Sequence, residues 1–259
     1  MILRRLGNKK RIAKDIIKHF PAHKIYIEPF FGAGGMFFSK PKAKYNIVND
    51  LDSDVFNLFQ VVMNQKEELE KAFYMMPIHS DLLEYWKANK EPEPIRKALR
   101  FLFLSNFTYL GKQDTMCFGT ENPKDIVFKH IDNTQKLLEG VQFSNRDYVK
   151  FLNQLRPRNA LSSFIYCDPP YLITTNTYSN SFTEEQTTTL FKTLIDTGCK
   201  FAVSEFDNPV ILDLAKQHNL EVITIGERCN LKNRRTEILV VNYESPAVYG
   251  LFGSINNHD

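Results

Sequence analysis

The chain has 259 residues, 43% of them hydrophobic and 24% charged, and it carries a formal net charge of +3. These values are typical of a globular protein formed by one large α/β domain or by a domain with an inserted lobe. No apolar stretch approaches the length of a membrane span, and the weakly basic charge permits a polyanionic partner without requiring one.

The cysteines and the basic N-terminal segment indicate the compartment. Cys117, Cys167, Cys199 and Cys229 are scattered and form no C-x-x-C pair, which argues against a zinc site or a disulfide framework. The basic residues near the start of the chain have no long apolar segment behind them, so a secretory signal is not expected. We therefore expect a cytoplasmic protein without a bound metal ion.

The start of the chain has the pattern that opens a doubly wound α/β sheet. Hydrophobic periodicity predicts these elements: a helix over residues 10–20, a strand over 24–30, a glycine turn over 31–35, a helix from Met36 and a strand over 45–48.

The alternation of helix and strand is interrupted once. The periodicity from Ser53 to about Leu110 is helical, and residues 112–129 are predicted to be irregular. Later strands are predicted over residues 141–143, 163–166, 200–203, 221–225 and 238–243.

Two helices separate the later strands. One begins at Thr183, where Gln186 completes a capping box, and the other begins at Asn208 with Pro209 in its first turn. These patterns predict a core over residues 1–52 and 141–245, an insertion over 53–140 and a tail over 246–259.

The tetrapeptide Asp168-Pro169-Pro170-Tyr171 stands where an apolar strand stops. Proline has no backbone N–H, so no donor in the two prolines competes for the Asp168 carboxylate or the Pro169 carbonyl. Two acceptors beside the flat ring of Tyr171 suit a planar ligand with an amino group, such as a nucleobase taken out of its stack. The alternative is a turn in which proline only ends strand pairing.

Glycines and acids after the first two strands indicate a nucleoside cofactor. Gly32 and Gly34 let a ligand approach the backbone closely, but they do not complete a G-x-G-x-x-G fingerprint for a pyrophosphate. Asp50 ends the second strand, where a carboxylate can hold ribose hydroxyls. The negative charge of Glu28 suits a sulfonium better than a phosphate, so the set favours S-adenosyl-L-methionine over NAD.

Asp147 and Tyr148 follow the third predicted strand. The carboxylate of Asp147 could accept from the amino group of a cofactor adenine, whose ring a flat side chain would line. The alternative is that Asp147 caps a helix that begins there.

The ordered set of motifs resembles one family. The motifs are Gly7-Asn8-Lys9, Glu28-Pro29-Phe30-Phe31-Gly32-Ala33-Gly34-Gly35, Asn49-Asp50, Asp147 and Asp168-Pro169-Pro170-Tyr171. From about Leu3 to Tyr243 the chain is similar to the Dam-like (alpha-type) DNA adenine-N6 methyltransferases.

The resemblance implies a fold and an activity. The fold would be an α/β, Rossmann-like, S-adenosylmethionine-dependent methyltransferase core with an inserted, mostly helical target-recognition domain. The activity would be transfer of a methyl group from S-adenosyl-L-methionine to the N6 amino group of adenine in double-stranded DNA, by base flipping and direct in-line transfer. We expect no metal, no membrane, and a monomer or weak dimer.

The resemblance also implies roles for individual residues. Asp168 and the Pro169 carbonyl would accept from the two amino hydrogens of the target adenine, and Tyr171 would stack on its ring. The implied cofactor residues are Gly7, Lys9, Glu28, Phe30, Gly32, Gly34, Asp50, Asp147, Tyr148, Asp168 and Tyr178. Arg5 and Leu6 stand where the family usually has an aromatic residue.

Two segments are predicted to contact DNA. Polar side chains between residues 105 and 125 can reach base edges or phosphates from a loop, and a basic loop precedes the last strand. The predicted contacts are Asn106, Tyr109, Lys112, Gln113, Lys124, Lys232, Arg234 and Arg235. Residues 112–129 contain no arginine, unlike the arginine-rich loop of similar enzymes, so the target sequence is not carried over. Solvated loop residues are the alternative.

Three other classes of protein share parts of this pattern. A dehydrogenase has the glycine turn and the acid, but it gives no reason for the tetrapeptide. A methyltransferase acting on cytosine, RNA or a protein glutamine has the same amino-group chemistry. A non-catalytic DNA-binding protein could retain the scaffold. The sequence leaves open whether the enzyme serves restriction-modification, a phage or regulation.

Overall fold

The computed structural model describes the chain except for residues 4–8, 118–122, 156–159, 173–181, 231–232 and 248–259. The chain forms two compact units. We call residues 1–11, 32–42 and 50–145 the helical unit, and residues 12–31, 43–49 and 146–259 the sheet unit. The predicted insertion lies wholly within the helical unit, which also takes in the N-terminal segment and the residues after the glycine turn.

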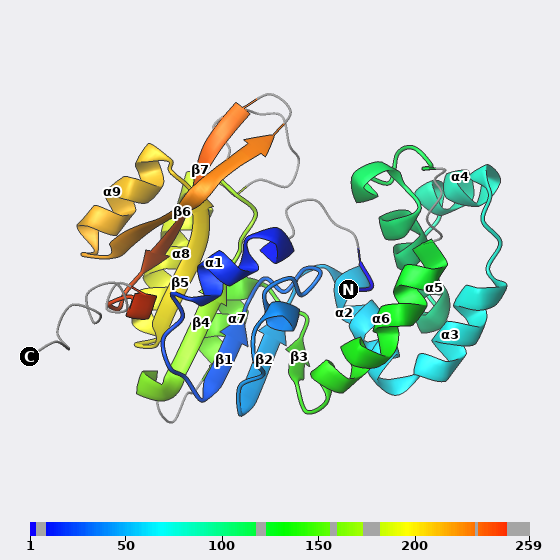
Figure 1. The fold of residues 1–259 in the computed structure, drawn as a ribbon, viewed down its shortest axis with the longest axis horizontal. Helices are drawn as coiled ribbons and strands as arrows, with labels where there is room; N and C mark the ends of the chain where they lie inside the picture. The colour runs from blue at the N-terminus through cyan, green and yellow to red at the C-terminus, as the bar shows by residue number, and fades with distance from the viewer. Residues whose placement is uncertain (4–8, 118–122, 156–159, 173–181, 231–232, 248–259) are drawn as a thin grey trace, which may run out of the picture. The chain divides into compact units, whose positions relative to one another are not determined.

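The sheet has seven strands in the order β3-β2-β1-β4-β5-β7-β6 (Figure 1). Strand β1 pairs in parallel with β2 and β4, β4 pairs in parallel with β5, and β7 is antiparallel to β5 and β6. The strands are β1 (Ile25–Glu28), β2 (Tyr45–Asn49), β3 (Gln142–Ser144), β4 (Ser163–Cys167), β5 (Lys200–Phe206), β6 (Glu221–Asn230) and β7 (Asn233–Val241). The predicted Rossmann-like α/β core is confirmed.

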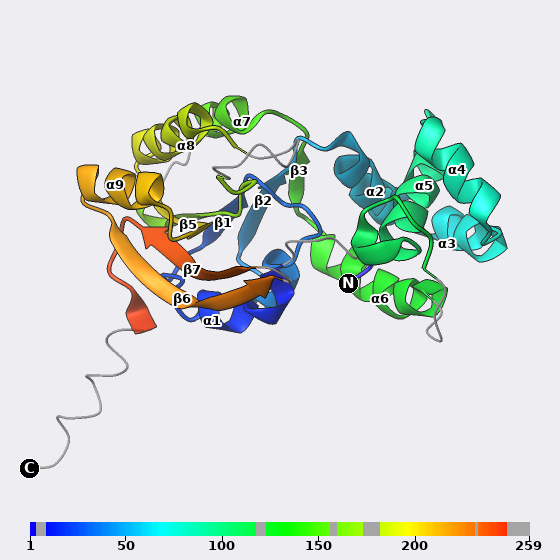
Figure 2. The same ribbon diagram turned by 90° about the horizontal axis from the view of Figure 1, so that it is seen from above.

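The central strands bury both faces of the sheet. Side chains alternate along a strand, so Ile27 and Ile165 pack on one face with helices α7 (Tyr148–Gln154), α8 (Glu184–Asp196) and α9 (Pro209–Gln217). Tyr26 and Phe164 face the other side, where their rings contact the ring of Phe20 beyond α1 (Ala13–Ile17). Figure 2 shows α7 and α8 on one side of the strands and α1 on the other.

The two predicted helix caps in the sheet unit are confirmed. Thr183 caps α8 through the Gln186 N–H, and the Gln186 side chain accepts from the Thr183 N–H in return. Asn208 caps α9, and Pro209 occupies the first turn, where a missing N–H costs nothing.

Two predicted helices near the N-terminus are wrong in length. The helix predicted over residues 10–20 is a 3₁₀ turn at Lys9–Arg11 followed by the five residues of α1. The helix predicted from Met36 is only a 3₁₀ turn at Phe37–Ser39. Lys40 is extended (φ −103°, ψ 160°), because the ring of Pro41 disfavours helical backbone at the preceding residue.

The helical unit confirms the predicted helical run and corrects its end. Its helices are α2 (Ser53–Asn64), α3 (Lys66–Met75), α4 (Ser80–Ala88), α5 (Pro94–Asn106) and α6 (Pro123–Leu138). Residues 123–129 were predicted to be irregular, but Pro123 begins α6, as proline favours the first helical position. Among the described residues, no helix is both long enough and apolar enough to cross a membrane.

Strands β6 and β7 form a longer hairpin than predicted. Pairing between β5 and β7 stops at Phe206, the last residue of β5, which lies opposite Glu237. The β7 residues before Glu237 still pair with β6, and this pairing reaches Asn233 opposite Asn230. The hairpin therefore extends past the end of β5, and it places Arg234 and Arg235 on a strand rather than in a loop.

Candidate active site

Buried carboxylates gather at the carboxyl end of the sheet unit. Glu28 ends β1, Glu205 lies one residue before the end of β5, and Glu237 faces that end from β7. Their exposed fractions are 2%, 2% and 1%, respectively. Half-buried Asp168 follows β4 directly. Parallel strands bring their carboxyl ends to one edge, so the sheet collects these acids where α/β proteins bind ligands.

The charges of these acids act on shared neighbours. Burial, and then the charge of Asp168, raise the pKa of Tyr166 well above its usual value, and Glu28 and Glu237 add to the increase. Burial, and then Glu28 and Asp168, raise the pKa of the Cys167 thiol in the same direction. The edge is therefore strongly anionic in a desolvated setting, which favours a cation or a group that donates hydrogen bonds.

Each deeply buried acid accepts hydrogen bonds from its own unit. The hydroxyl of Tyr26 donates to Glu28 Oε2 at 2.7 Å. The N–H groups of Leu172 and Phe206 donate to the two oxygens of Glu205, at 3.1 and 2.9 Å. These bonds offset part of the cost of burying charge.

The tetrapeptide is fastened at its last residue. The hydroxyl of Tyr171 donates to Glu237 Oε1 at 2.6 Å, and its ring meets the ring of Phe206 edge-on, with centroids 4.6 Å apart. Pro169 is buried and Pro170 is exposed. The prediction that the strand stops where the tetrapeptide begins is confirmed, because β4 ends at Cys167.

Sequence reasoning missed Glu205, Phe206 and Glu237 as members of this site. For the two glutamates, the signal was an acid within, or at the start of, an otherwise apolar strand, where a buried charge needs a specific partner.

Three aromatic rings form a second cluster in the sheet unit. The rings of Phe30, Tyr148 and Phe182 contact one another, with centroid distances of 5.4 to 5.7 Å. An isolated parallel bridge pairs Phe182 with Leu172, the residue after the tetrapeptide. The cluster is therefore tied to the residue that follows the tetrapeptide, and Phe182 is a member that the sequence analysis missed.

Asp147 caps α7, as the alternative interpretation stated. Its Oδ1 accepts from the N–H groups of Val149 and Lys150, at 2.9 and 3.4 Å. Both bonds use one oxygen, so the other oxygen can still face a ligand. Burial and then the charge of Asp147 raise the pKa of Tyr148 to about 12, and its hydroxyl donates to the Gln186 carbonyl at 2.9 Å.

The glycine turn and Asp50 are linked within the helical unit. Gly32 N–H donates to Asp50 Oδ2 at 2.6 Å, and Asp52 N–H donates to Oδ1 at 2.8 Å. Gly32 and Gly34 have φ angles of +53° and +72°, which favour glycine. Among the described residues, no atom outside Gly32 and its two chain neighbours lies within 4 Å of where a Gly32 side chain would begin. The turn thus leaves open space next to an oriented carboxylate.

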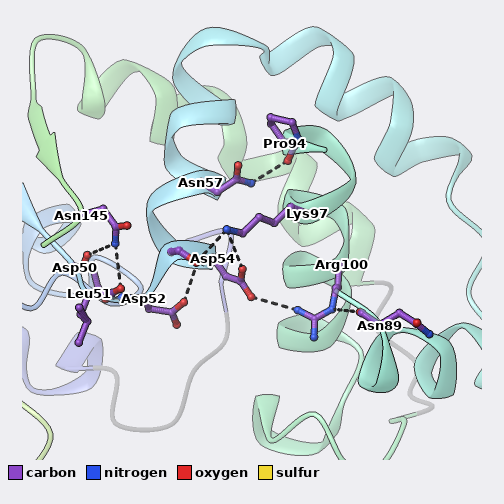
Figure 3. Close-up of polar contacts among 11 residues, drawn as sticks. Asp50, Leu51, Asp52, Asp54, Asn57, Asn89, Pro94, Lys97, Arg100 and Asn145 are labelled. Carbon is purple, nitrogen blue, oxygen red and sulfur yellow. Dashed lines mark hydrogen bonds and ion pairs between the residues drawn. The ribbon is translucent and has the colours of Figure 1, made fainter. Parts of the chain in front are cut away.

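A polar network holds the Asp50 segment in the helical unit (Figure 3). Asn145 donates to the Asp50 carbonyl at 2.7 Å and to the Leu51 carbonyl at 3.1 Å. Asp52 caps α2 by accepting from Asp54 N–H at 2.9 Å. The Asp54 carboxylate pairs with Lys97 at 3.5 Å and Arg100 at 3.2 Å, both on α5 (Figure 3).

A small hairpin in the helical unit carries three of the predicted DNA contacts. Thr108 bridges Met116, and Gln113 N–H donates to the Thr108 hydroxyl at 3.0 Å. Tyr109 is 53% exposed, and Lys112 and Gln113 are exposed as well. Gln113 has a φ of +66°, an uncommon backbone conformation for a residue other than glycine.

Two other predicted DNA contacts are directed into the fold instead. Asn106 lies on α5 with 4% exposure, and its amide donates to the Ile2 and Leu102 carbonyls at 3.0 Å each. Lys124 lies on α6, where its ammonium donates to the Met76 and Tyr74 carbonyls at 2.6 and 2.9 Å. Desolvation lowers the pKa of Lys124. Both side chains are therefore engaged by backbone carbonyls of the helical unit, and their contact with DNA stays a prediction.

The remaining predicted residues are distributed as follows. Lys9 is buried in the 3₁₀ turn of the helical unit. In the sheet unit, the guanidinium of Arg235 lies 5.4 Å from the centre of the Phe206 ring. Gly7, Tyr178 and Lys232 lie outside the described residues. Within the described parts of the chain, no group of His, Cys, Asp and Glu side chains could hold a metal ion.

Comparisons with known proteins identify similar chains. The family model described as D12 class N6 adenine-specific DNA methyltransferase matches residues 6–230. DNA adenine methylase from Escherichia coli (strain K12) is 24% identical over 241 residues, which cover 85% of each chain. Type II methyltransferase M1.LlaDCHI from Lactococcus lactis subsp. cremoris is 24% identical over 272 residues, which cover 92% of this chain and 93% of that protein.

A solved structure was also similar. The N-terminal domain of human METTL16, crystallised in complex with SAH, matches with 10% identity and a TM-score of 0.42. The match covers 90% of this chain and 68% of that chain.

Proposed function

This chain belongs to the family of D12 class N6 adenine-specific DNA methyltransferases, and from that premise we propose that its Asp168–Tyr171 segment methylates a flipped adenine in double-stranded DNA. The enzyme uses S-adenosyl-L-methionine as its methyl donor. The observation that carries the proposal is the anionic carboxyl edge of the sheet unit, where Asp168 follows β4 and acts on the same neighbour, Tyr166, as buried Glu28 and Glu237.

The residues of the sheet unit fit the cofactor. The rings of Phe30, Tyr148 and Phe182 offer an aromatic surface for adenine, and the second oxygen of Asp147 can accept from its amino group. The charge of Glu28 favours a sulfonium.

The resemblance also assigns cofactor roles to residues of the helical unit. Asp50, oriented by two backbone N–H groups, would accept from the ribose hydroxyls, and the turn at Gly32 and Gly34 permits close backbone approach. The resemblance adds Gly7, Lys9 and Tyr178 to the cofactor-binding set.

The proposed mechanism depends on positioning rather than on a strong base. Bound S-adenosylmethionine supplies a methyl group that its sulfonium charge has already activated. The Asp168 carboxylate and the Pro169 carbonyl accept from the two amino hydrogens of adenine, which directs the nitrogen lone pair toward the methyl group. Tyr171 stacks on the flipped base and offsets part of the cost of unstacking, on the order of a few kcal/mol. The amino proton leaves after the in-line transfer.

We further propose that two hairpins contact DNA. In the helical unit, Tyr109, Lys112 and Gln113 are exposed on the hairpin closed by Thr108 and Met116. In the sheet unit, the β6–β7 hairpin carries Arg234 and Arg235 and continues into Lys232 along the chain. Cationic side chains there would neutralise phosphates, and the polar tip at Gln113 could reach base edges.

Methyl transfer from labelled S-adenosyl-L-methionine to plasmid DNA, followed by base-resolved mapping, tests the proposal. We expect label in adenine within a short fixed sequence. Asp168→Ala should reduce transfer by at least about a thousandfold, because the variant loses the acceptor that orients the amino group. Asp196→Ala, which removes an exposed acid at the end of α8, is the matched control and should retain activity.

The same experiment separates the alternatives. Label confined to cytosine, RNA or protein would contradict the substrate, and full activity of Asp168→Ala would contradict the mechanism while leaving the family unchanged. DNA binding without any methyl transfer would indicate a non-catalytic scaffold.

A further inference from the structure

We propose that Glu237 is a positioning residue that orients the ring of Tyr171 for stacking on the target adenine. This inference rests on the proposed function, in which Tyr171 is the stacking surface. Glu237 lies on β7, which follows the tetrapeptide by more than sixty residues, and no motif of the sequence links the two.

Three contacts converge on the end of the tetrapeptide. The Tyr171 hydroxyl donates to Glu237 Oε1 at 2.6 Å, and the edge-on ring of Phe206 lies at a centroid distance of 4.6 Å. The next N–H, that of Leu172, donates to Glu205 Oε2 at 3.1 Å. One contact holds the hydroxyl, one holds the ring and one holds the backbone, so they restrict both side-chain torsions of Tyr171.

The pairing of β5 with β7 places these groups together. Phe206 is the register partner of Glu237, and Glu205 precedes Phe206 on the same strand. Two residues earlier on β7, Arg235 lies on the same face as Glu237, and its guanidinium stands over the Phe206 ring at 5.4 Å. The clamp is therefore built from rigid strands, which position side chains more exactly than loops do.

Glu237 is suited to hold a phenol hydroxyl firmly. It is 1% exposed, so its carboxylate is desolvated and its bond with the hydroxyl is charge-assisted, short and strong. Without that bond, the Tyr171 ring would rotate among orientations, and only some of them would lie parallel to a flipped base. The bond thus holds the Tyr171 ring in the stacking orientation before the base arrives, so the ring does not have to be ordered in each catalytic cycle.

Four variants test the clamp. Glu237→Leu removes the acceptor, Tyr171→Phe removes the donor but keeps the ring, Glu237→Gln keeps an acceptor oxygen, and the double variant combines the two deletions. Tyr243→Phe is the matched control, because it deletes a hydroxyl that donates to the His19 carbonyl, away from the tetrapeptide. Thermal unfolding and S-adenosyl-L-methionine binding establish that each variant is folded.

The kinetic readout is kcat and KM on a duplex that carries the mapped target sequence. We expect Glu237→Leu and Tyr171→Phe each to lower kcat by about tenfold with KM for DNA nearly unchanged, since the stacked state forms only after binding. Glu237→Gln should remain within about threefold of wild type. The double variant should be no slower than either single one, because both deletions break the same bond.

The spectroscopic readout uses 2-aminopurine in place of the target adenine. A flipped 2-aminopurine emits weakly when it stacks on an aromatic ring and more strongly when it does not. Emission should therefore be higher in Glu237→Leu and Tyr171→Phe than in wild type, Glu237→Gln and Tyr243→Phe.

The outcomes are distinguishable. Folded single variants with wild-type kcat and emission would overturn the clamp alone, as would a double variant whose loss is the product of the two single losses. A wild-type enzyme that transfers no methyl group to adenine would overturn the proposed function and the clamp with it. If Glu237→Leu fails to fold, Tyr171→Phe and Glu237→Gln decide between these outcomes.

Discussion

Three buried carboxylates concentrate negative charge at the carboxyl end of the strands in the sheet unit. Glu28, Glu205 and Glu237 are almost fully buried, and each accepts at least one hydrogen bond from within the unit. Like charges in a desolvated region repel each other, so a cation or a donor that arrives beside them is bound more tightly than it would be in water. This electrostatic attraction would favour both a sulfonium, which is a cation, and an exocyclic amino group, which donates hydrogen bonds.

The charge of Glu28 should discriminate between the methyl donor and its product. Glu28→Gln keeps an oxygen that can accept from the Tyr26 hydroxyl but removes the charge. We expect the variant to bind S-adenosyl-L-methionine about tenfold more weakly, and S-adenosylhomocysteine, which has no sulfonium, almost normally. Isothermal titration with both ligands measures this, and Asp196→Asn provides the control for loss of an exposed charge. Equal weakening for both ligands would contradict an electrostatic role.

Asp147 should have two separable effects, because it is both a helix cap and a proposed cofactor ligand. Asp147→Ala removes the acceptor for the Val149 and Lys150 N–H groups and should reduce the free energy of unfolding by about 1 kcal/mol. Asp147→Asn can still cap α7 and should retain stability. Denaturant unfolding measures the cap, and titration with S-adenosyl-L-methionine measures the ligand role. Tight cofactor binding by a destabilised Asp147→Ala would restrict Asp147 to capping.

At the scale of elements, α2 and α5 form the frame that carries the two segments of the helical unit for which we propose functions. The N-terminus of α2 follows Asp50, and α5 ends next to the hairpin that exposes Tyr109. Arg100 joins the two helices through Asp54 and donates to the Asn89 carbonyl at 3.0 Å (Figure 3). It also donates to the Trp86 carbonyl at 2.9 Å. One half-buried cation thus fastens α2, the end of α4 and α5.

Loss of Arg100 should destabilise the helical unit well beyond an ordinary surface substitution. Arg100→Leu removes one of the two cations that pair with the Asp54 carboxylate in Figure 3 and leaves Lys97 as the other. It also removes the donor to the Trp86 and Asn89 carbonyls. We therefore expect the free energy of unfolding to fall by about 2 kcal/mol. Arg96→Leu, at an exposed position of the same helix, should cost little. Chemical denaturation of both variants compares them. Equal stability of the two would show that the Asp54–Arg100 pair is dispensable.

At the scale of the whole molecule, buried tyrosines make the free energy of unfolding depend on pH in the alkaline range. Burial is the main cause that raises the pKa of Tyr26 and Tyr166 well above the usual value of 10.0, and it raises the pKa of Tyr148 to about 12. A pKa that is higher in the folded than in the unfolded state means that the folded chain holds its proton longer. This stabilisation is complete below about pH 10 and is lost as pH rises through the folded values.

Alkaline unfolding should therefore accompany tyrosine ionisation. We expect the free energy of unfolding to be steady up to about pH 10 and to fall between about pH 10 and 12, with absorbance at 295 nm rising together with the loss of secondary structure. Tyr148→Phe, which cannot ionise, should shift the onset to higher pH once its stability at neutral pH is taken into account. Full tyrosine ionisation in a chain that remains folded would contradict this linkage.

The sequence by itself determined that the core is a Rossmann-like α/β sheet and which residues carry the proposed chemical functions, which stay predictions. The positions of the strands, the caps at Thr183 and Asn208 and the stop before Asp168 follow from periodicity and from the backbone preferences of near neighbours, which are local properties of the chain. Helix length was less predictable where a single residue ended a helix early. Pro41 did so for the segment after Met36, because it disfavours helical backbone at Lys40.

Only the tertiary structure decided which side chains meet and which are directed inward. Glu237 reaches Tyr171 because β7 inserts beside β5, and Phe182 joins Phe30 and Tyr148 through a bridge to Leu172. Asn106 looks available to DNA in the sequence, yet it is buried, because which face of a helix is covered depends on the segments that pack against it. Contacts between residues far apart along the chain are set by strand order and packing, and no local pattern encodes them.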